Sequence, residues 1–98
     1  EELGDKVGIA GSHNNIGAVY QVQGKYPEAL KEYYAALRIN EELNNKEFIA
    51  ANHNNIGTIY TSQNNLEDAL KEFNTSLKIR ELLGDKFGIA ESHANIGV

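Results

Sequence analysis

An internal repeat of 40 residues restricts the possible folds of this chain more than any other feature. The second 40 residues match the first 40 at 19 positions without a gap, and the last 18 match the start of the chain at 13 positions. Identity of about half favours natural divergence over an idealised consensus design. The shared core segment is HNNIG or HANIG, at 13–17, 53–57 and 93–97. The sequence therefore predicts one array in a single domain, 1–98, with repeats at about 5–44, 45–84 and, in part, 85–98.

Within each repeat the apolar residues recur at spacings of three and four, which is typical of one face of an α-helix. The first stripe comprises Ile9, His13, Ile16 and Tyr20, repeated as Ile49, His53, Ile56 and Tyr60. The second comprises Ala29, Leu30, Tyr33, Ala36 and Leu37, repeated as Ala69, Leu70, Phe73, Ser76 and Leu77. These stripes predict helices at about 5–22, 26–43, 45–62, 66–83 and 85–98. They predict no strand.

Residues that favour turns separate the predicted helices. Gly4, Asn44 and Gly84 tolerate the left-handed conformation that ends many helices, and each precedes an Asp or Asn able to cap the next helix. Gly24 and Asn64 interrupt the chain inside the repeats. We therefore expect the residues up to Gly4 to finish a preceding helix, and short turns to join the later helices.

The composition is that of a folded domain and excludes several classes of protein. The 98 residues are 41% hydrophobic and 23% charged, with a formal net charge of -5. An acidic chain is a poor ligand for nucleic acid, and no apolar run is long enough to span a membrane. The absence of Cys excludes disulfides and thiolate zinc sites. Because the sequence has no Met, we expect it to be part of a longer protein. We expect its location to be cytoplasmic.

The order of small and large residues in the repeats resembles the tetratricopeptide repeat family. The matching residues are Ile16, Gly17, Tyr20, Gly24, Tyr26, Ala29, Tyr33 and Ala36, then Ile56, Gly57, Tyr60, Ala69 and Phe73. The resemblance covers essentially the whole chain and implies an all-α fold, a right-handed α-solenoid of antiparallel helix pairs. The period exceeds the family's usual length of about 34 and is similar to the long repeats of Pins-type scaffolds, kinesin light chains and bacterial signalling proteins.

Small residues are expected where the paired helices cross. Gly17 and Gly57 remove side-chain bulk, which lets the backbones approach and lets Tyr33 and Phe73 fill the adjoining space. The second repeat departs from the family pattern at three positions, so we expect its packing to be less close. These positions are Asn64, Leu66 and Ser76.

The resemblance also implies a concave groove, lined by the first helix of each repeat, that holds a partner segment. The implied groove positions are Gly11, Asn14, Asn15, Ala18, Gln21, Val22, Ala51, Asn54, Asn55, Thr58, Thr61, Ser62, Glu91, Asn95 and Val98. Asn15, Asn55 and Asn95 would form a ladder of amides suited to the backbone of an extended peptide. Asn14, Asn54, Gln21, Thr58 and Thr61 would add selectivity. The alternative is that these helical asparagines are merely solvated or bonded to a neighbouring turn.

The charge of the groove positions restricts the ligand. Family members that bind acidic chaperone tails use Lys and Arg in the groove, whereas the matching positions here hold Asn, Ala, Thr and Glu. We therefore expect a neutral or basic extended segment, or one amphipathic helix.

Three histidines recur in register and could suggest a metal or catalytic site. Stacked repeats place equivalent atoms about 10 Å apart, whereas zinc needs ligands about 2 Å from one centre. The apolar neighbours of His13, His53 and His93 favour a packing role instead. We expect no catalytic residue, metal or cofactor.

The predicted function is therefore a non-catalytic protein interaction module in a larger scaffold or signalling protein. A structural spacer or self-association segment is the alternative, and an enzyme is a distant third. The face of the last predicted helix that includes His93, Gly97 and Ile89 or Ile96 would have no cover. Copies could then associate weakly, by a two-fold contact or end to end.

Overall fold

Four α-helices form residues 2–84, the part of the chain that this computed structural model describes, with side chains described from residue 5. The helices are α1 Glu2–Val22, α2 Tyr26–Glu42, α3 Lys46–Ser62 and α4 Leu66–Leu83. No strand occurs within these residues. The all-helical architecture is thus confirmed, and the predicted fifth helix at 85–98 lies outside the described residues.

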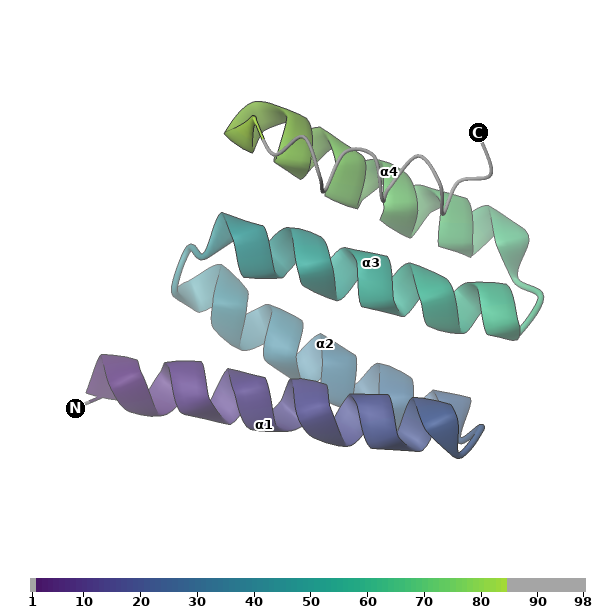
Figure 1. Ribbon diagram of the computed structural model, residues 1–98, viewed down its shortest axis with the longest axis horizontal. Coiled ribbons are helices and arrows are strands. Elements are labelled where there is room, and N and C mark those ends of the chain that lie inside the picture. The colour runs from purple at the N-terminus through teal and green to yellow at the C-terminus, as the bar shows by residue number, and fades with distance from the viewer. Residues whose placement is uncertain (1, 85–98) are drawn as a thin grey trace.

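The helices form two antiparallel pairs stacked side by side. α1 packs on α2, α3 packs on α4, and α2 packs on α3 to join the pairs. In Figure 1, α1 and α3 lie next to each other toward the viewer, and α2 lies behind them. The molecule is therefore a short helical solenoid, as the sequence predicts.

The turns between the helices have one shared geometry. Gly24, Asn44 and Asn64 take positive φ angles of +74°, +54° and +62°. At each turn the next backbone N–H donates to a carbonyl five residues earlier, as in the bond of 2.9 Å from Lys25 to Tyr20. This is the Schellman arrangement, in which Gly or Asn ends a helix. Gly84 ends α4 in the same left-handed conformation, so the predicted turn residues from 24 onward are confirmed.

Two expectations about helix ends are wrong. Gly4 lies inside α1, which runs without a break from Glu2 to Val22, and ends no helix. Asn45 stands at the start of α3, but its side chain makes no capping hydrogen bond. Its carbonyl instead accepts the first helical bond, from Ile49 at 2.9 Å.

The core is centred where α2 packs on α3. Ile56 and Ile59 are fully buried there, against Ala29, Tyr33 and Leu37. Their equivalents one repeat earlier, Ile16 and Val19, are 45% and 57% exposed, because no described helix covers that face of α1. Stacking of the repeats, rather than the apolar stripe alone, therefore decides which residues are buried.

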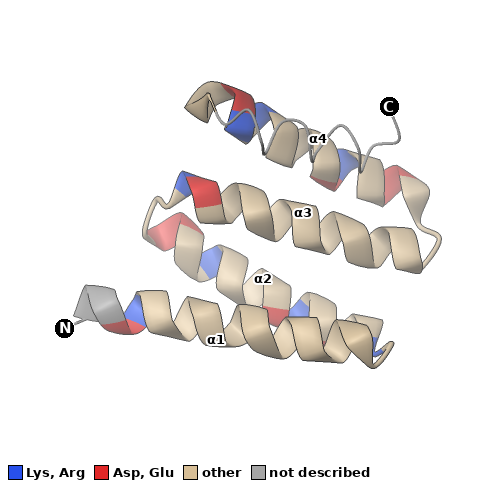
Figure 2. Cartoon of the chain, in the orientation of Figure 1, with Lys and Arg blue, Asp and Glu red and all other residues tan. Residues whose placement is uncertain are grey.

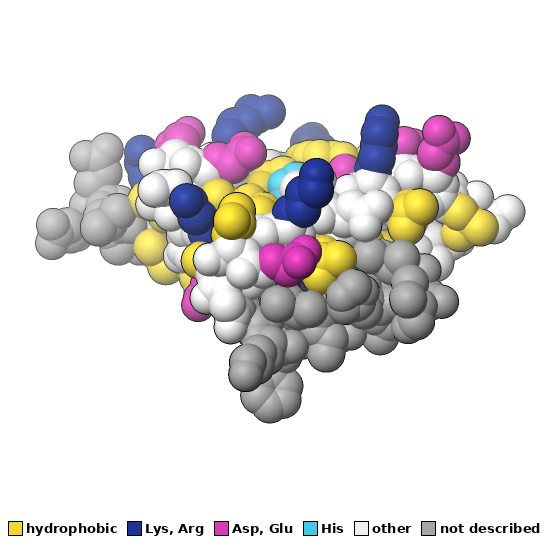
Figure 3. Space-filling model, turned by 90° about the horizontal axis from the view of Figure 1, so that it is seen from above, with side chains coloured by type: hydrophobic (Ala, Val, Ile, Leu, Met, Phe, Trp, Pro, Cys, Tyr) yellow, Lys and Arg dark blue, Asp and Glu magenta, His cyan; other side chains and the backbone are white. Residues whose placement is uncertain are grey.

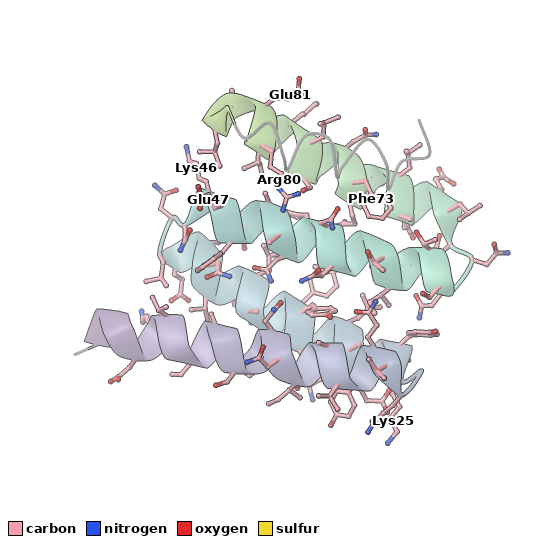
Figure 4. The ribbon with its side chains drawn as sticks, in the orientation of Figure 1. Lys25, Lys46, Glu47, Phe73, Arg80 and Glu81 are labelled. Atoms are coloured by element: carbon pink, nitrogen blue, oxygen red, sulfur yellow. The ribbon has the colours of Figure 1, made fainter. Side chains whose placement is uncertain are left out.

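Glycines let the two helices of each pair approach closely. A Cβ atom at Gly17 would lie 2.9 Å from ring atoms of Tyr33, and one at Gly57 would lie 2.7 Å from the ring of Phe73. Figure 4 shows Phe73 pointing from α4 toward α3. The close crossing is confirmed in both pairs, so the looser packing expected for the second repeat is wrong at this point.

The departures in the second repeat affect exposure and hydrogen bonding instead. Leu66 is 60% exposed. Ser76 replaces the small Ala36 of the first repeat and is fully buried. Its hydroxyl has no hydrogen-bond partner among the residues that the structure describes. No helix in this part of the chain combines the length and hydropathy that crossing a membrane requires.

Candidate peptide-binding groove

The face formed by α1 and α3 carries almost no charge. The described charged side chains of these helices are Asp5 and Lys6 in α1 and Lys46 and Glu47 in α3. All four stand near the helix starts, and Figure 4 shows Lys46 and Glu47 at one end of α3. Between 7 and 22, and between 48 and 62, neither helix has an acidic or basic residue other than histidine.

Charges gather instead on the second helix of each pair. α2 and α4 carry Lys, Arg, Asp and Glu along most of their length, and Figure 2 shows this separation between charged and uncharged ribbons. Seen from above, the blue and magenta side chains gather mainly along one edge of the molecule (Figure 3). The face of α1 and α3 is therefore suited to an uncharged ligand, since a charged group there would lose hydration without a partner.

An asparagine pair connects the two helices of this face. Asn55 Nδ2 donates to Asn14 Oδ1 at 3.2 Å, and both side chains are half-buried. Asn15 is exposed. Asn95 lies outside the described residues, as do Glu91 and Val98. The structure thus brings Asn14 and Asn55 together, whereas Asn15, the repeat equivalent of Asn55, is exposed.

The remaining predicted site residues are less free than the sequence suggests. Asn54 is buried, at 7% exposure, so it does not present an open side chain to a groove. Gln21 accepts a hydrogen bond of 2.7 Å from the Tyr33 hydroxyl. Thr58 and Thr61 each donate at 3.0 Å to a carbonyl one turn earlier in α3, which leaves their oxygens only as acceptors.

The described histidines hold the helix pairs together. His13 Nδ1 donates to Glu32 Oε1 at 2.7 Å, and His53 Nδ1 donates to Glu72 Oε1 at the same distance. Each bond joins the first helix of a repeat to the second. The predicted packing role is thus extended by a polar contact, and no cluster of three or more potential metal ligands occurs among the described residues.

The glutamate partners of the histidines were missed in the sequence analysis. A signal for them existed, because Glu32 follows His13 by 19 residues and Glu72 follows His53 by the same interval. A recurring pair at constant separation favours a contact between the two helices of one repeat.

A pair of tyrosines joins α2 to α3 in a way that the sequence did not indicate. The hydroxyls of Tyr34 and Tyr60 lie 2.9 Å apart. Burial, together with this hydrogen bond and nearby negative charges, raises the pKa of Tyr34 well above its usual value. Burial also raises the pKa of Tyr33. Both raised values mean that the hydroxyls of Tyr33 and Tyr34 stay neutral near pH 7.

A buried amide pair was also missed. Asn40 Nδ2 donates to Asn52 Oδ1 at 2.7 Å, and the two residues are only 5% and 3% exposed. The bond links the end of α2 to α3. Together with the bond from Asn55 to Asn14, it fixes the second helix pair against the first.

Comparisons with known proteins agree with this geometry. A family model described as tetratricopeptide repeat matches residues 8–97. The chain belongs to the tetratricopeptide repeat family. Tetratricopeptide repeats are in general protein interaction modules and are typically not catalytic. A comparison with curated proteins gives no match.

A solved tetratricopeptide structure shows the same fold. The N-terminal domain of stress-induced protein-1 (STI-1) from C. elegans superposes with a TM-score of 0.72 at 23% sequence identity. The match covers 88% of this chain and 66% of that domain, so the present chain spans slightly less than two thirds of it. This likeness concerns the fold alone.

Proposed function

We propose that this tetratricopeptide array binds an uncharged extended segment of a protein partner along α1 and α3, within a larger scaffold or signalling protein. The observation that carries the proposal is the neutral face of these two helices beside the strongly charged α2 and α4. A charged ligand would lose hydration on such a face, whereas a peptide backbone needs only amide partners.

The asparagines supply those partners in this proposal. Asn15 is exposed, and Asn55 shares its amide with Asn14 while remaining half-exposed. Each amide offers a donor and an acceptor, as a peptide unit does. Asn95 continues the series by sequence. Asn14, Gln21, Thr58 and Thr61 have the supporting role, and Asn54, which is buried, has no such role.

Peptide selection followed by calorimetry tests this function. Peptides selected from a random display library on the native chain are titrated against the double variant Asn15→Ala and Asn55→Ala. We expect the affinity to fall by about tenfold or more, since two amide contacts are lost. The matched control is Asn74→Ala, an exposed asparagine on the charged helix α4. Equal affinities for the double variant and the native chain would place the binding surface elsewhere.

Self-association is the second candidate, and the exposure of one face of α1 favours it. Ile16 and Val19 present to solvent the surface that their equivalents in α3 bury against α2. The face of the last predicted helix lies outside the described residues. Sedimentation over a hundredfold range of concentration distinguishes the two candidate functions. Association that is lost in the variant Val19→Lys supports self-association. A chain that stays monomeric throughout the range rejects it.

A further inference from the structure

A hollow of about 260 Å³ opens between the first halves of α1 and α3. Ala10 and Gly11 line it from α1, and Phe48 and Ala51 line it from α3. At its base lie Asn40 and Asn52, which are almost fully buried. Phe48, at 50% exposure, marks the rim.

The size of the hollow suits one side chain. An apolar cavity of about 150 Å³ holds a benzene molecule, whereas pockets for drug-sized ligands measure about 300 to 1,000 Å³. The hollow therefore has room for one aromatic ring with a substituent. It contains no charged residue, so a Lys, Arg, Asp or Glu side chain would enter without a partner.

The base of the hollow specifies a polar tip on that side chain. The bond from Asn40 to Asn52 uses the amide nitrogen of Asn40 and the amide oxygen of Asn52. It leaves the Asn40 oxygen as an acceptor and the Asn52 nitrogen as a donor. A purely hydrocarbon side chain would cover both groups without replacing their contact with water. A phenolic hydroxyl can donate a hydrogen bond to the Asn40 oxygen and accept one from the Asn52 nitrogen.

We infer that this hollow binds a tyrosine side chain of the partner segment, with its ring between α1 and α3 and its hydroxyl on the Asn40 and Asn52 amides. The inference rests on the proposed function, since it assigns an anchor to the peptide on the same face. The rim is continuous with the peptide-binding face, because Asn14 also borders the hollow and holds Asn55.

The test uses p-cresol, the side chain of tyrosine, and toluene, the side chain of phenylalanine, as separate probes. Each is titrated into the isotope-labelled chain while the side-chain amide signals of Asn40 and Asn52 are followed by NMR. We expect p-cresol to shift these signals and to bind about fivefold more tightly than toluene, which lacks the hydroxyl. Equal affinity for the two probes, or shifts confined to other residues, would overturn the inference.

Two glycines of α1 supply a matched pair of variants. A Cβ atom at Gly8 or at Gly11 would meet nothing within 4 Å, so both positions accept a side chain. Gly11 borders the hollow and Gly8 does not. Gly11→Leu should fill the hollow and abolish binding of p-cresol, while Gly8→Leu should leave it unchanged. Binding that survives in Gly11→Leu contradicts the assignment.

Replacing the amide pair tests the role of the base directly. In the double variant Asn40→Leu and Asn52→Leu both hydrogen-bonding partners are exchanged for apolar groups of similar size, which leaves no unpaired group behind. The preference should then reverse in favour of toluene. A retained preference for p-cresol would show that the asparagines do not recognise the hydroxyl.

The outcomes also separate this inference from the proposed function. If selected peptides depend on Asn15 and Asn55 but contain no tyrosine and tolerate Gly11→Leu, groove binding holds and the tyrosine anchor is wrong. If p-cresol binds as expected but the selected peptides are indifferent to the asparagine variants, the hollow is real and the proposed function fails.

Discussion

At the scale of single residues, the closeness of each helix pair depends on one glycine. Gly17 faces Tyr33 and Gly57 faces Phe73, in both cases with less than 3 Å available to an added Cβ atom. Glycine weakens a helix by about 1 kcal/mol relative to alanine. The aromatic packing that the glycine permits must offset this cost. Replacing glycine by alanine should therefore destabilise the fold where an aromatic ring packs on the glycine, and stabilise it where the glycine faces open space.

We predict that Gly57→Ala lowers the free energy of unfolding by about 1 to 3 kcal/mol, because the ring of Phe73 has to move. Gly8→Ala is the control, since its Cβ atom meets nothing and the helix gains up to about 1 kcal/mol. Urea unfolding of the two variants measures both effects. Stabilisation by both substitutions would contradict the packing argument.

The unpaired hydroxyl of Ser76 gives a second prediction. The residue is fully buried, and its equivalent in the first repeat is Ala36. Ser76→Ala should raise the free energy of unfolding by about 1 kcal/mol, because a buried hydroxyl without a partner is lost. The reverse exchange, Ala36→Ser, should lower it. Thermal unfolding measures both, and a destabilising Ser76→Ala would show that the hydroxyl has a partner.

The tyrosine pair between the repeats makes stability depend on alkaline pH. The folded state raises the pKa of Tyr34 above the unfolded value of about 10, so folding favours the neutral hydroxyl. This contribution is complete below that value and is lost as the pH rises above it. The stability of the native chain relative to Tyr34→Phe should therefore stay constant up to about pH 9 and decrease as the pH rises above about 10. Urea unfolding measures the difference, and a constant difference would reject this coupling.

At the scale of helices and turns, the sequence predicted most of the described structure. The apolar stripes placed α2, α3 and α4 within one residue at each end, because a period of 3.6 residues with Gly or Asn at the turns leaves few alternatives. The error at Gly4 has a different origin. Gly4 is the same residue type as Gly24 and Gly84, yet it lies within α1, so residue type alone does not decide where a helix ends.

The burial of equivalent residues could not be read from the repeat. Ile16 and Ile56 occupy the same place in identical HNNIG segments, yet they are 45% and 0% exposed. Asn14 is likewise half-buried, whereas its repeat equivalent Asn54 is buried. Stacking against a neighbouring repeat decides burial, and the sequence of one repeat contains no information about where the array is covered.

This difference gives a prediction for a pair of matched variants. Ile56→Ala should lower the free energy of unfolding by about 2 to 5 kcal/mol, since it opens a cavity between α2 and α3. Ile16→Ala removes the same atoms from an exposed face and should cost about 1 kcal/mol or less. Denaturant unfolding compares them. Equal losses would mean that α1 is covered in solution.

At the scale of the whole molecule, the arrangement separates two kinds of surface. The first helices form a nearly uncharged face joined by the hydrogen bond from Asn55 to Asn14, and the second helices carry the charges. The groove residues came from resemblance to the tetratricopeptide family. The amide pair of Asn40 and Asn52 could not be found in that way, because the equivalent positions in the other repeats, Arg80 and Ser12, are different residues.

NMR mapping of a selected peptide on the isotope-labelled chain tests the central claim most directly. If the uncharged face is the binding surface, the largest shifts should fall on Gly11, Asn14, Asn15 and Thr58. The charged helices provide the internal control, since Lys31 in α2 and Lys71 in α4 are exposed and should not respond. Shifts that concentrate on α2 and α4 while α1 and α3 stay unchanged would contradict the account.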